Sequence, residues 1–210
     1  MRIILVEDHL MFREVIRRVC ATDLGHTIVG ETRSARDAVT FIVELGPDLV
    51  ILDLQLSDGN GFEVIHRVQQ AAPSVHLLVL TSYCDPHTLF RLEGAKIHGF
   101  LDKTTDMVAT LREALNAIAI GRTYFSATFR AAQAARNHDP ASLYKVLSGW
   151  EIKILSLIGR GLSDDEIGAQ LDISPRTAQT HRSNILLKLG IGGTPKLIAY
   201  AMENGVTRWR

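Results

Sequence analysis

The chain contains little of what defines several large classes of protein. Its 210 residues include only two cysteines, Cys20 and Cys84, too few for a disulfide-built scaffold, so we expect two unpaired thiols in a reducing compartment. No apolar run approaches the roughly 20 residues that span a bilayer. The first apolar run ends at Glu7, which is too early for a signal peptide. The sequence therefore predicts a cytoplasmic protein with no membrane partner.

A surplus of charge of either sign is also missing. Lys plus Arg equal Asp plus Glu at 23 each, so the net charge indicates neither a nucleic acid nor a membrane as partner. The distribution is less even, because residues 1–125 carry 12 basic and 16 acidic side chains, whereas residues 126–210 carry 11 and 7. The two halves are therefore expected to have different partners.

The first 120 residues alternate short apolar runs with amphipathic stretches, which is typical of a parallel sheet buried between helices. The expected strands cover residues 3–6, 27–30, 49–52, 75–80 and 99–101. The expected helices cover residues 10–21, 34–45, 60–71, 86–94 and 105–120. Five strands and five helices in strict alternation predict a flavodoxin-like α/β domain over residues 1–120, with five parallel strands in the order 2-1-3-4-5.

The periodicity weakens over residues 121–147, which we interpret as a partly helical linker. Residues 148–210 are expected to form a small all-α domain. Three capping signals mark helix starts in this part: Ser148 with Glu151, Ser163 with Glu166, and Ser174 before Pro175. We expect its helices to begin near residues 149, 164 and 175, with a fourth over about 194–204.

Three carboxylates follow the ends of two expected strands. Glu7 and Asp8 come directly after the first strand, and Asp53 comes after the third. Because parallel strands present their carboxyl ends at one edge of the sheet, these side chains should lie together at the switch point, where ligands bind. Three anions there repel one another unless a cation joins them, and hard oxygen ligands suit Mg²⁺.

Thr81 and Lys103 reach the same edge from the fourth and fifth strands. A hydroxyl and an ammonium there could hold the oxygens of a phosphoryl group on Asp53, whose carboxylate can act as a nucleophile toward phosphorus. An acyl phosphate is reactive, so it suits a reversible switch.

These residues, in this order at these strand ends, resemble the receiver domain of two-component response regulators over about residues 1–120. The resemblance implies that Asp53 is the phosphoacceptor, and that Asp8, Asp53 and the Gln55 carbonyl bind Mg²⁺, with Glu7 contributing through water. It also implies that Thr81 and Phe100 form a switch pair. Two positions depart from the family pattern: Ser57 stands where proline is frequent, and Lys96-Ile97 where a Gly-Ala pair is frequent. Neither position is expected to touch the acid pocket.

A short turn at residues 172–174 separates two of the C-terminal helices, as in a helix-turn-helix. On the second of them Arg176, Gln179, Thr180 and Ser183 fall at i, i+3, i+4 and i+7, an exposed polar stripe at the end where a recognition helix reads bases.

Residues 161–168, 174–185 and 188–190 are similar to the LuxR-type DNA-binding domain of the NarL/FixJ class, which covers roughly residues 146–208. The resemblance implies base contacts by Gln179, Thr180 and Ser183, phosphate contacts by Arg176, Arg182 and Lys188, and dimerisation through a helix at about 195–204. The family commonly has Val-Lys where this chain has Ala178-Gln179. A neutral amide that can pair with adenine replaces a cation there, so operator preference and salt dependence should both differ.

Two other functions fit the sequence less well. A haloacid-dehalogenase-type phosphatase needs a second aspartate two residues after the nucleophile, where this chain has Gln55. A scaffold that is never phosphorylated would predict a degraded acid pocket, yet Glu7, Asp8 and Asp53 are intact. The sequence therefore favours a transcription regulator rather than an enzyme. In the regulator that the sequence predicts, a sensor histidine kinase phosphorylates Asp53, and the phosphorylation controls homodimerisation and binding to double-stranded DNA.

Overall fold

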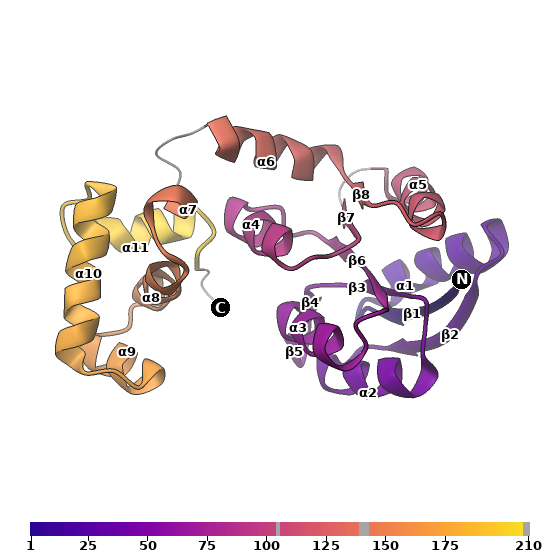
Figure 1. Cartoon of the computed structure of the whole chain (residues 1–210), viewed down its shortest axis with the longest axis horizontal. Coiled ribbons are helices and arrows are strands. Elements are labelled where there is room, and N and C mark those ends of the chain that lie inside the picture. The colour runs from indigo at the N-terminus through magenta and orange to yellow at the C-terminus, as the bar shows by residue number, and fades with distance from the viewer. Residues whose placement is uncertain (104–105, 139–142, 208–210) are drawn as a thin grey trace. The chain divides into compact units, whose positions relative to one another are not determined.

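The computed structural model of the chain describes residues 1–103, 106–138 and 143–207 (Figure 1). Contacts divide the chain into two compact units. The first comprises Met1–Cys84 and Leu92–Ala131, and the second Asp85–Arg91 and Ala132–Arg210. The limits of the linker remain a prediction.

A parallel sheet forms the centre of the first unit. Its strands are β1 (Arg2–Val6), β2 (Thr27–Thr32), β3 (Leu49–Leu52), β6 (His76–Thr81) and β7 (Gly99–Asp102). Their order, β2-β1-β3-β6-β7, confirms the predicted doubly wound topology. A sixth short strand, β8 (Tyr124–Phe125), pairs with β7 in the stretch interpreted as linker. The central strands β1 and β3 are buried on both faces, which explains why they read as continuous apolar runs.

Helices cover both faces of this sheet (Figure 1). One face carries α1 (Leu10–Arg17), its π-helical continuation η1 (Arg18–Asp23) and α5 (Met107–Ala119), whose apolar residues share a single core cluster. The helices α2 (Ala35–Leu45) and α3 (Gly61–Ala71) pack against each other. The helix α4 (Pro86–Gly94) follows β6, and its residues up to Arg91 are grouped with the second unit. All five helices lie where the sequence predicts them, within a few residues.

Two short segments position the end of β3. A hairpin of β4 (Gln55–Leu56) and β5 (Gly59–Asn60) follows Asp53 directly. After it, α3 begins against the Asp53 backbone: a Cβ on Gly61 would lie 2.7 Å from the Asp53 carbonyl oxygen. Only glycine allows this close approach, so Gly61 fixes the path by which the chain leaves the acidic strand end.

The segment after β8 forms α6 (Ala127–His138). Phe129 at its start is buried, and its ring packs against Phe100 of β7 and Phe125 of β8, with centroids 5.2 and 4.7 Å apart. The Thr128 hydroxyl donates to Asp102 at 3.0 Å. The beginning of α6 is therefore attached to β7 through both apolar and polar contacts.

The second unit is helical. It contains α7 (Leu143–Val146), α8 (Gly149–Gly159), α9 (Asp164–Leu171), α10 (Pro175–Leu189) and α11 (Thr194–Glu203). Ser148 and Ser163 form the two predicted capping boxes with Glu151 and Glu166, and the Ser174 side chain accepts a hydrogen bond from the Thr177 N–H. These caps begin α8, α9 and α10 at the predicted residues.

Within the residues that the structure describes, no single helix has the length and apolar composition needed to cross a membrane. Only α10 and α11 taken together meet that test, and the chain bends by 69° between them.

Candidate phosphorylation site and nucleic-acid interface

The ends of four parallel strands meet in the first unit. The Asp53 N–H donates to the Val6 carbonyl at 2.9 Å, which places Asp53 beside Glu7 and Asp8. The Lys103 N–H donates to the Thr81 carbonyl at 3.0 Å, which joins the other two strand ends. The backbone therefore brings all five residues to the same edge of the sheet, as the sequence predicts.

A buried ion cluster lies at this edge. The Lys103 ammonium contacts Asp53 Oδ2 at 2.7 Å and Glu7 Oε2 at 2.8 Å, and the three side chains are at most 3% exposed. Burial raises the pKa of Glu7, the Lys103 ammonium opposes that rise, and the Asp53 carboxylate adds to it. One cation faces several carboxylates here, so the cluster favours a further positive charge.

The donor atoms fit a hard divalent cation. Ligand atoms of Glu7, Asp8, His9 and Asp53 all lie within 4.8 Å of one another. Asp8 Oδ1 is buried and accepts no hydrogen bond from another element of the described chain, since the group that approaches it is the neighbouring His9 ring, with Nδ1 at 2.9 Å. A buried carboxylate oxygen without a donor is unfavourable unless a cation or water meets it. Carboxylates grouped in this way suit Mg²⁺.

His9 is a member of this group that sequence reasoning missed. Its Nδ1 lies 2.9 Å from Asp8 Oδ1 and 3.4 Å from Glu7 Oε1, although its side chain is 63% exposed. Its place directly after Glu7-Asp8 was the available signal. Gln55, by contrast, is tied to the cluster through its main chain, because its N–H donates to Asp53 Oδ1 at 3.1 Å.

The two residues expected to form the switch pair are both fully buried. Thr81 accepts a hydrogen bond at Oγ1 from the Tyr83 N–H at 3.3 Å. Phe100 packs against Phe129 rather than lying among the carboxylates. Phe100 therefore joins β7, the strand that ends just before Lys103, to the start of α6.

Ser57 corrects one expectation drawn from the sequence. Its position was expected to lie outside the acid pocket, but the Ser57 main-chain N–H donates to Asp8 Oδ2 at 3.0 Å. The reason is the hairpin, which turns the chain back from Asp53 toward the end of β1. A backbone contact of this kind constrains the sequence only by excluding proline, which has no N–H.

In the second unit, α9 and α10 flank a turn in which Asp172 has a left-handed backbone, with φ at 55°. Of the six residues expected to contact DNA, four form an exposed stripe on α10, namely Arg176, Gln179, Thr180 and Ser183; Lys188 is exposed as well, and Arg182 is half-buried. On the opposite side Ala178 and Ile185 are buried in the core of the unit. The predicted polar stripe is therefore presented to solvent.

The other two expected contacts have partners inside the unit. Arg182 binds Asp164 at 2.8 Å and donates to the Leu162 carbonyl at 3.2 Å. Lys188 binds Glu151 at 2.8 Å, and the hydrogen bond from Lys188 is the largest cause of the lowered pKa of that carboxyl. Both cations thus connect α10 to neighbouring elements of the helical unit.

An acid pocket at the switch point of a parallel sheet, followed in the chain by a capped helix-turn-helix, defines a class of phosphorylation-responsive DNA-binding regulators. Residues 3–116 match the response regulator receiver domain, and residues 145–201 match the luxR family of bacterial regulatory proteins. The chain belongs to the two-component response regulators that carry a LuxR-type DNA-binding domain.

Individual relatives agree with this assignment. The response regulator protein VraR of Staphylococcus saprophyticus is 31% identical over 98% of both chains. A LuxR-family two-component response regulator from Aurantimonas sp. is 29% identical, covering 66% of this chain and 98% of that one, with a TM-score of 0.61. RcsB from Salmonella enterica serovar Typhimurium, solved bound to a promoter with the phosphomimetic BeF3⁻, shares the fold at 23% identity. That match covers 97% of this chain and 98% of RcsB, with a TM-score of 0.68.

Proposed function

We propose that Asp53 accepts a phosphoryl group from the phosphohistidine of a sensor kinase, and that this modification controls homodimerisation and binding to double-stranded DNA. The observation that carries the proposal is the setting of the Asp53 carboxylate. It is 2% exposed, one oxygen contacts Lys103, and the other accepts the Gln55 N–H. Both oxygens are thereby oriented within the acid cluster.

In the transfer, an Asp53 oxygen forms a bond to phosphorus while the bond from phosphorus to the histidine nitrogen breaks, and its electron pair stays on the imidazole. Bound Mg²⁺ would supply charge neutralisation at the phosphoryl oxygens, held by Asp8, Asp53 and the Gln55 carbonyl, with Glu7 behind them. Lys103 and the Thr81 hydroxyl would hold the transferred group. Lys103 would then give up part of its contact with Asp53.

The readout follows from the position of β7. Lys103 directly follows β7, and Phe100 within β7 packs against α6, so a shift at the phosphorylated edge favours a different arrangement of this strand and helix. In the second unit Gln179, Thr180 and Ser183 would contact bases, and Arg176 would contact phosphate. Arg182 and Lys188 would reach phosphates only by leaving Asp164 and Glu151.

The test uses a small phosphodonor, acetyl phosphate, with the native chain and Asp53→Asn. Mass spectrometry measures phosphorylation, sedimentation measures dimerisation, and selection from a DNA library measures binding. We expect the donor to phosphorylate the native chain, promote its dimerisation and tighten its DNA binding, with each effect absent in Asp53→Asn. If the variant responds like the native chain, or if neither dimerisation nor DNA binding changes in the native chain, the proposal fails.

A further inference from the structure

The β4–β5 hairpin is too small to be stable by itself. Only two residue pairs join its strands, Gln55 with Asn60 and Leu56 with Gly59. Isolated two-stranded hairpins are marginal in water even when they are longer. The conformation of the chain just after Asp53 must therefore depend on anchors outside the hairpin.

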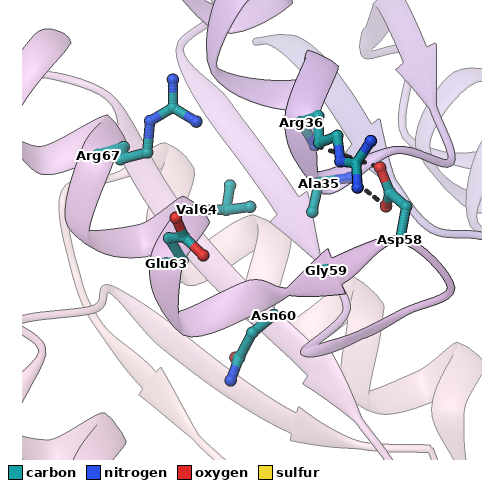
Figure 2. Close-up of a pocket in the computed structure, with 8 residues that line it drawn as sticks. All are labelled: Ala35, Arg36, Asp58, Gly59, Asn60, Glu63, Val64 and Arg67. Carbon is teal, nitrogen blue, oxygen red and sulfur yellow. Dashed lines mark hydrogen bonds between the residues drawn. The ribbon is translucent and has the colours of Figure 1, made fainter. Parts of the chain in front are cut away.

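Asp58 provides one such anchor, at the start of α2. Its carboxylate accepts the Ser34 hydroxyl at 2.7 Å and the Ala35 N–H at 2.8 Å, and these contacts lower the pKa of the carboxyl, the Ser34 bond most. Figure 2 shows Asp58 reaching the first turn of α2 beside a pocket between α2 and α3. A Cβ on Gly59 would lie 2.7 Å from Ala35 Cβ, so this glycine lets the hairpin sit directly on α2.

The anchored hairpin delivers one main-chain donor to the acid pocket. The Ser57 N–H binds Asp8 Oδ2 at 3.0 Å, while Asp8 Oδ1 faces the acid cluster, where the exposed His9 ring approaches it with Nδ1 at 2.9 Å. The two oxygens of this carboxylate are thus distinguished, because a main-chain donor of the hairpin holds Oδ2, whereas Oδ1 lies among the candidate cation ligands, which include His9. A proline at position 57 would lack this N–H.

We propose that the Ser57 main-chain N–H is a positioning donor for the divalent-cation site, and that Asp58 holds it in place. By fixing Asp8 through Oδ2, it presents Oδ1 to the cation before the cation arrives. Partners that orient metal ligands in this way commonly change metal affinity by tenfold or more when they are removed. The inference rests on the proposed function, because it concerns the cation that phosphoryl transfer at Asp53 requires.

The decisive comparison is between Ser57→Pro and Ser57→Ala in the full chain. Leu56 lies in a strand, the conformation that the residue before a proline prefers, so the backbone at Leu56 does not oppose a proline at position 57. We expect Ser57→Pro to weaken Mg²⁺ binding, measured by calorimetry, by about tenfold. Ser57→Ala keeps the N–H and should bind Mg²⁺ with the native affinity. Equal affinity in all three proteins, or an equal loss in both variants, would overturn the proposal.

A second pair of variants tests the anchor without touching position 57. Asp58→Asn weakens the attachment of the hairpin to α2. Asp37→Asn removes a carboxylate from the first turn of α2, to which Asp58 binds, but leaves the hairpin attached. We expect a loss of Mg²⁺ affinity of about threefold to tenfold for Asp58→Asn and little change for Asp37→Asn. Equal affinities in these two variants would show that general charge, not the anchor, determines binding.

The outcomes separate this inference from the proposed function. If the native chain binds Mg²⁺ and is phosphorylated by acetyl phosphate while Ser57→Pro binds Mg²⁺ equally well, only the positioning role fails. If the native chain binds no Mg²⁺ and is not phosphorylated, the proposed function fails and the positioning role fails with it. Thermal unfolding of each variant shows whether a change in affinity reflects loss of fold, and we expect the midpoints of both Ser57 variants to lie close to the native one.

Discussion

The acid pocket and the polar stripe of α10 differ in burial and in how their side chains are paired. In the pocket, Glu7, Asp53 and Lys103 are almost fully buried and bind one another. On α10, Gln179, Thr180 and Ser183 are exposed, and the two hydroxyls bond only to carbonyls of their own helix. On the proposed function, a site for a small, highly charged group would be organised by the protein interior, whereas a site for a large polyanion would leave its contacts open for the partner.

The largest effect is expected at Lys103. Replacing it with methionine leaves two buried carboxylates without their cation, so we expect the free energy of unfolding of the first unit to fall by about 3–5 kcal/mol at pH 7. Chemical denaturation measures the effect. The exposed Lys96, changed to methionine, is the control and should alter stability by less than about 0.5 kcal/mol. Similar losses in both variants would mean that the pocket is not electrostatically distinct.

On α10 the expected effect falls on affinity rather than stability. Gln179→Ala should weaken binding to the selected DNA site by about 1–3 kcal/mol, because a bidentate base contact is lost, and should leave the unfolding midpoint unchanged. Fluorescence anisotropy with the selected site and with an unrelated duplex measures the difference. An equal loss on both duplexes would assign Gln179 to the backbone and not to a base.

Glu151 is an inward-facing carboxylate of the helical unit, 6% exposed, with its pKa lowered mainly by the hydrogen bond from Lys188. A lowered pKa contributes stability that is present above the ordinary value of about 4.3 and is lost as pH falls through the folded-state pKa. We expect Glu151→Gln to cost about 1–2 kcal/mol at pH 7 and progressively less below about pH 4. Unfolding curves across that range provide the measurement; a cost that does not change with pH would contradict the ion pair as its source.

The smallest effect separates two arginines on one helix. Arg176→Ala should reduce the steepness of the plot of log affinity against log salt concentration by about 1, as expected for the loss of one phosphate contact, with little effect on stability. Arg182→Ala removes the contacts with Asp164 and the Leu162 carbonyl, so it should destabilise the helical unit and leave the salt slope nearly unchanged. If instead Arg182→Ala reduced the salt slope and Arg176→Ala did not, Arg182 would have to leave Asp164 when DNA is bound.

Much of this architecture could be predicted from the sequence. Apolar runs give the five main strands, and serine-glutamate spacings give the starts of α8 and α9, because both depend on neighbours in the sequence. The acid cluster follows, since parallel strands end at one edge. Contacts between residues far apart in the sequence were not predictable. The Ser57 N–H reaches Asp8 across 49 residues, and Arg182 reaches Asp164 across 18. The strands of β4, β5 and β8 are two residues long, too short to carry a periodicity.

The attachment of α6 to β7 bears on how such regulators are recombined. Phe129 covers Phe100, and Thr128 is bonded to Asp102, so a chimera cut just after α5 would strip β7 of β8 and expose a buried aromatic ring. An edge strand uncovered in this way invites pairing with other chains. A biosensor built by fusing this receiver to a new output module should therefore retain the chain through Ala131, and the junction is best placed beyond it.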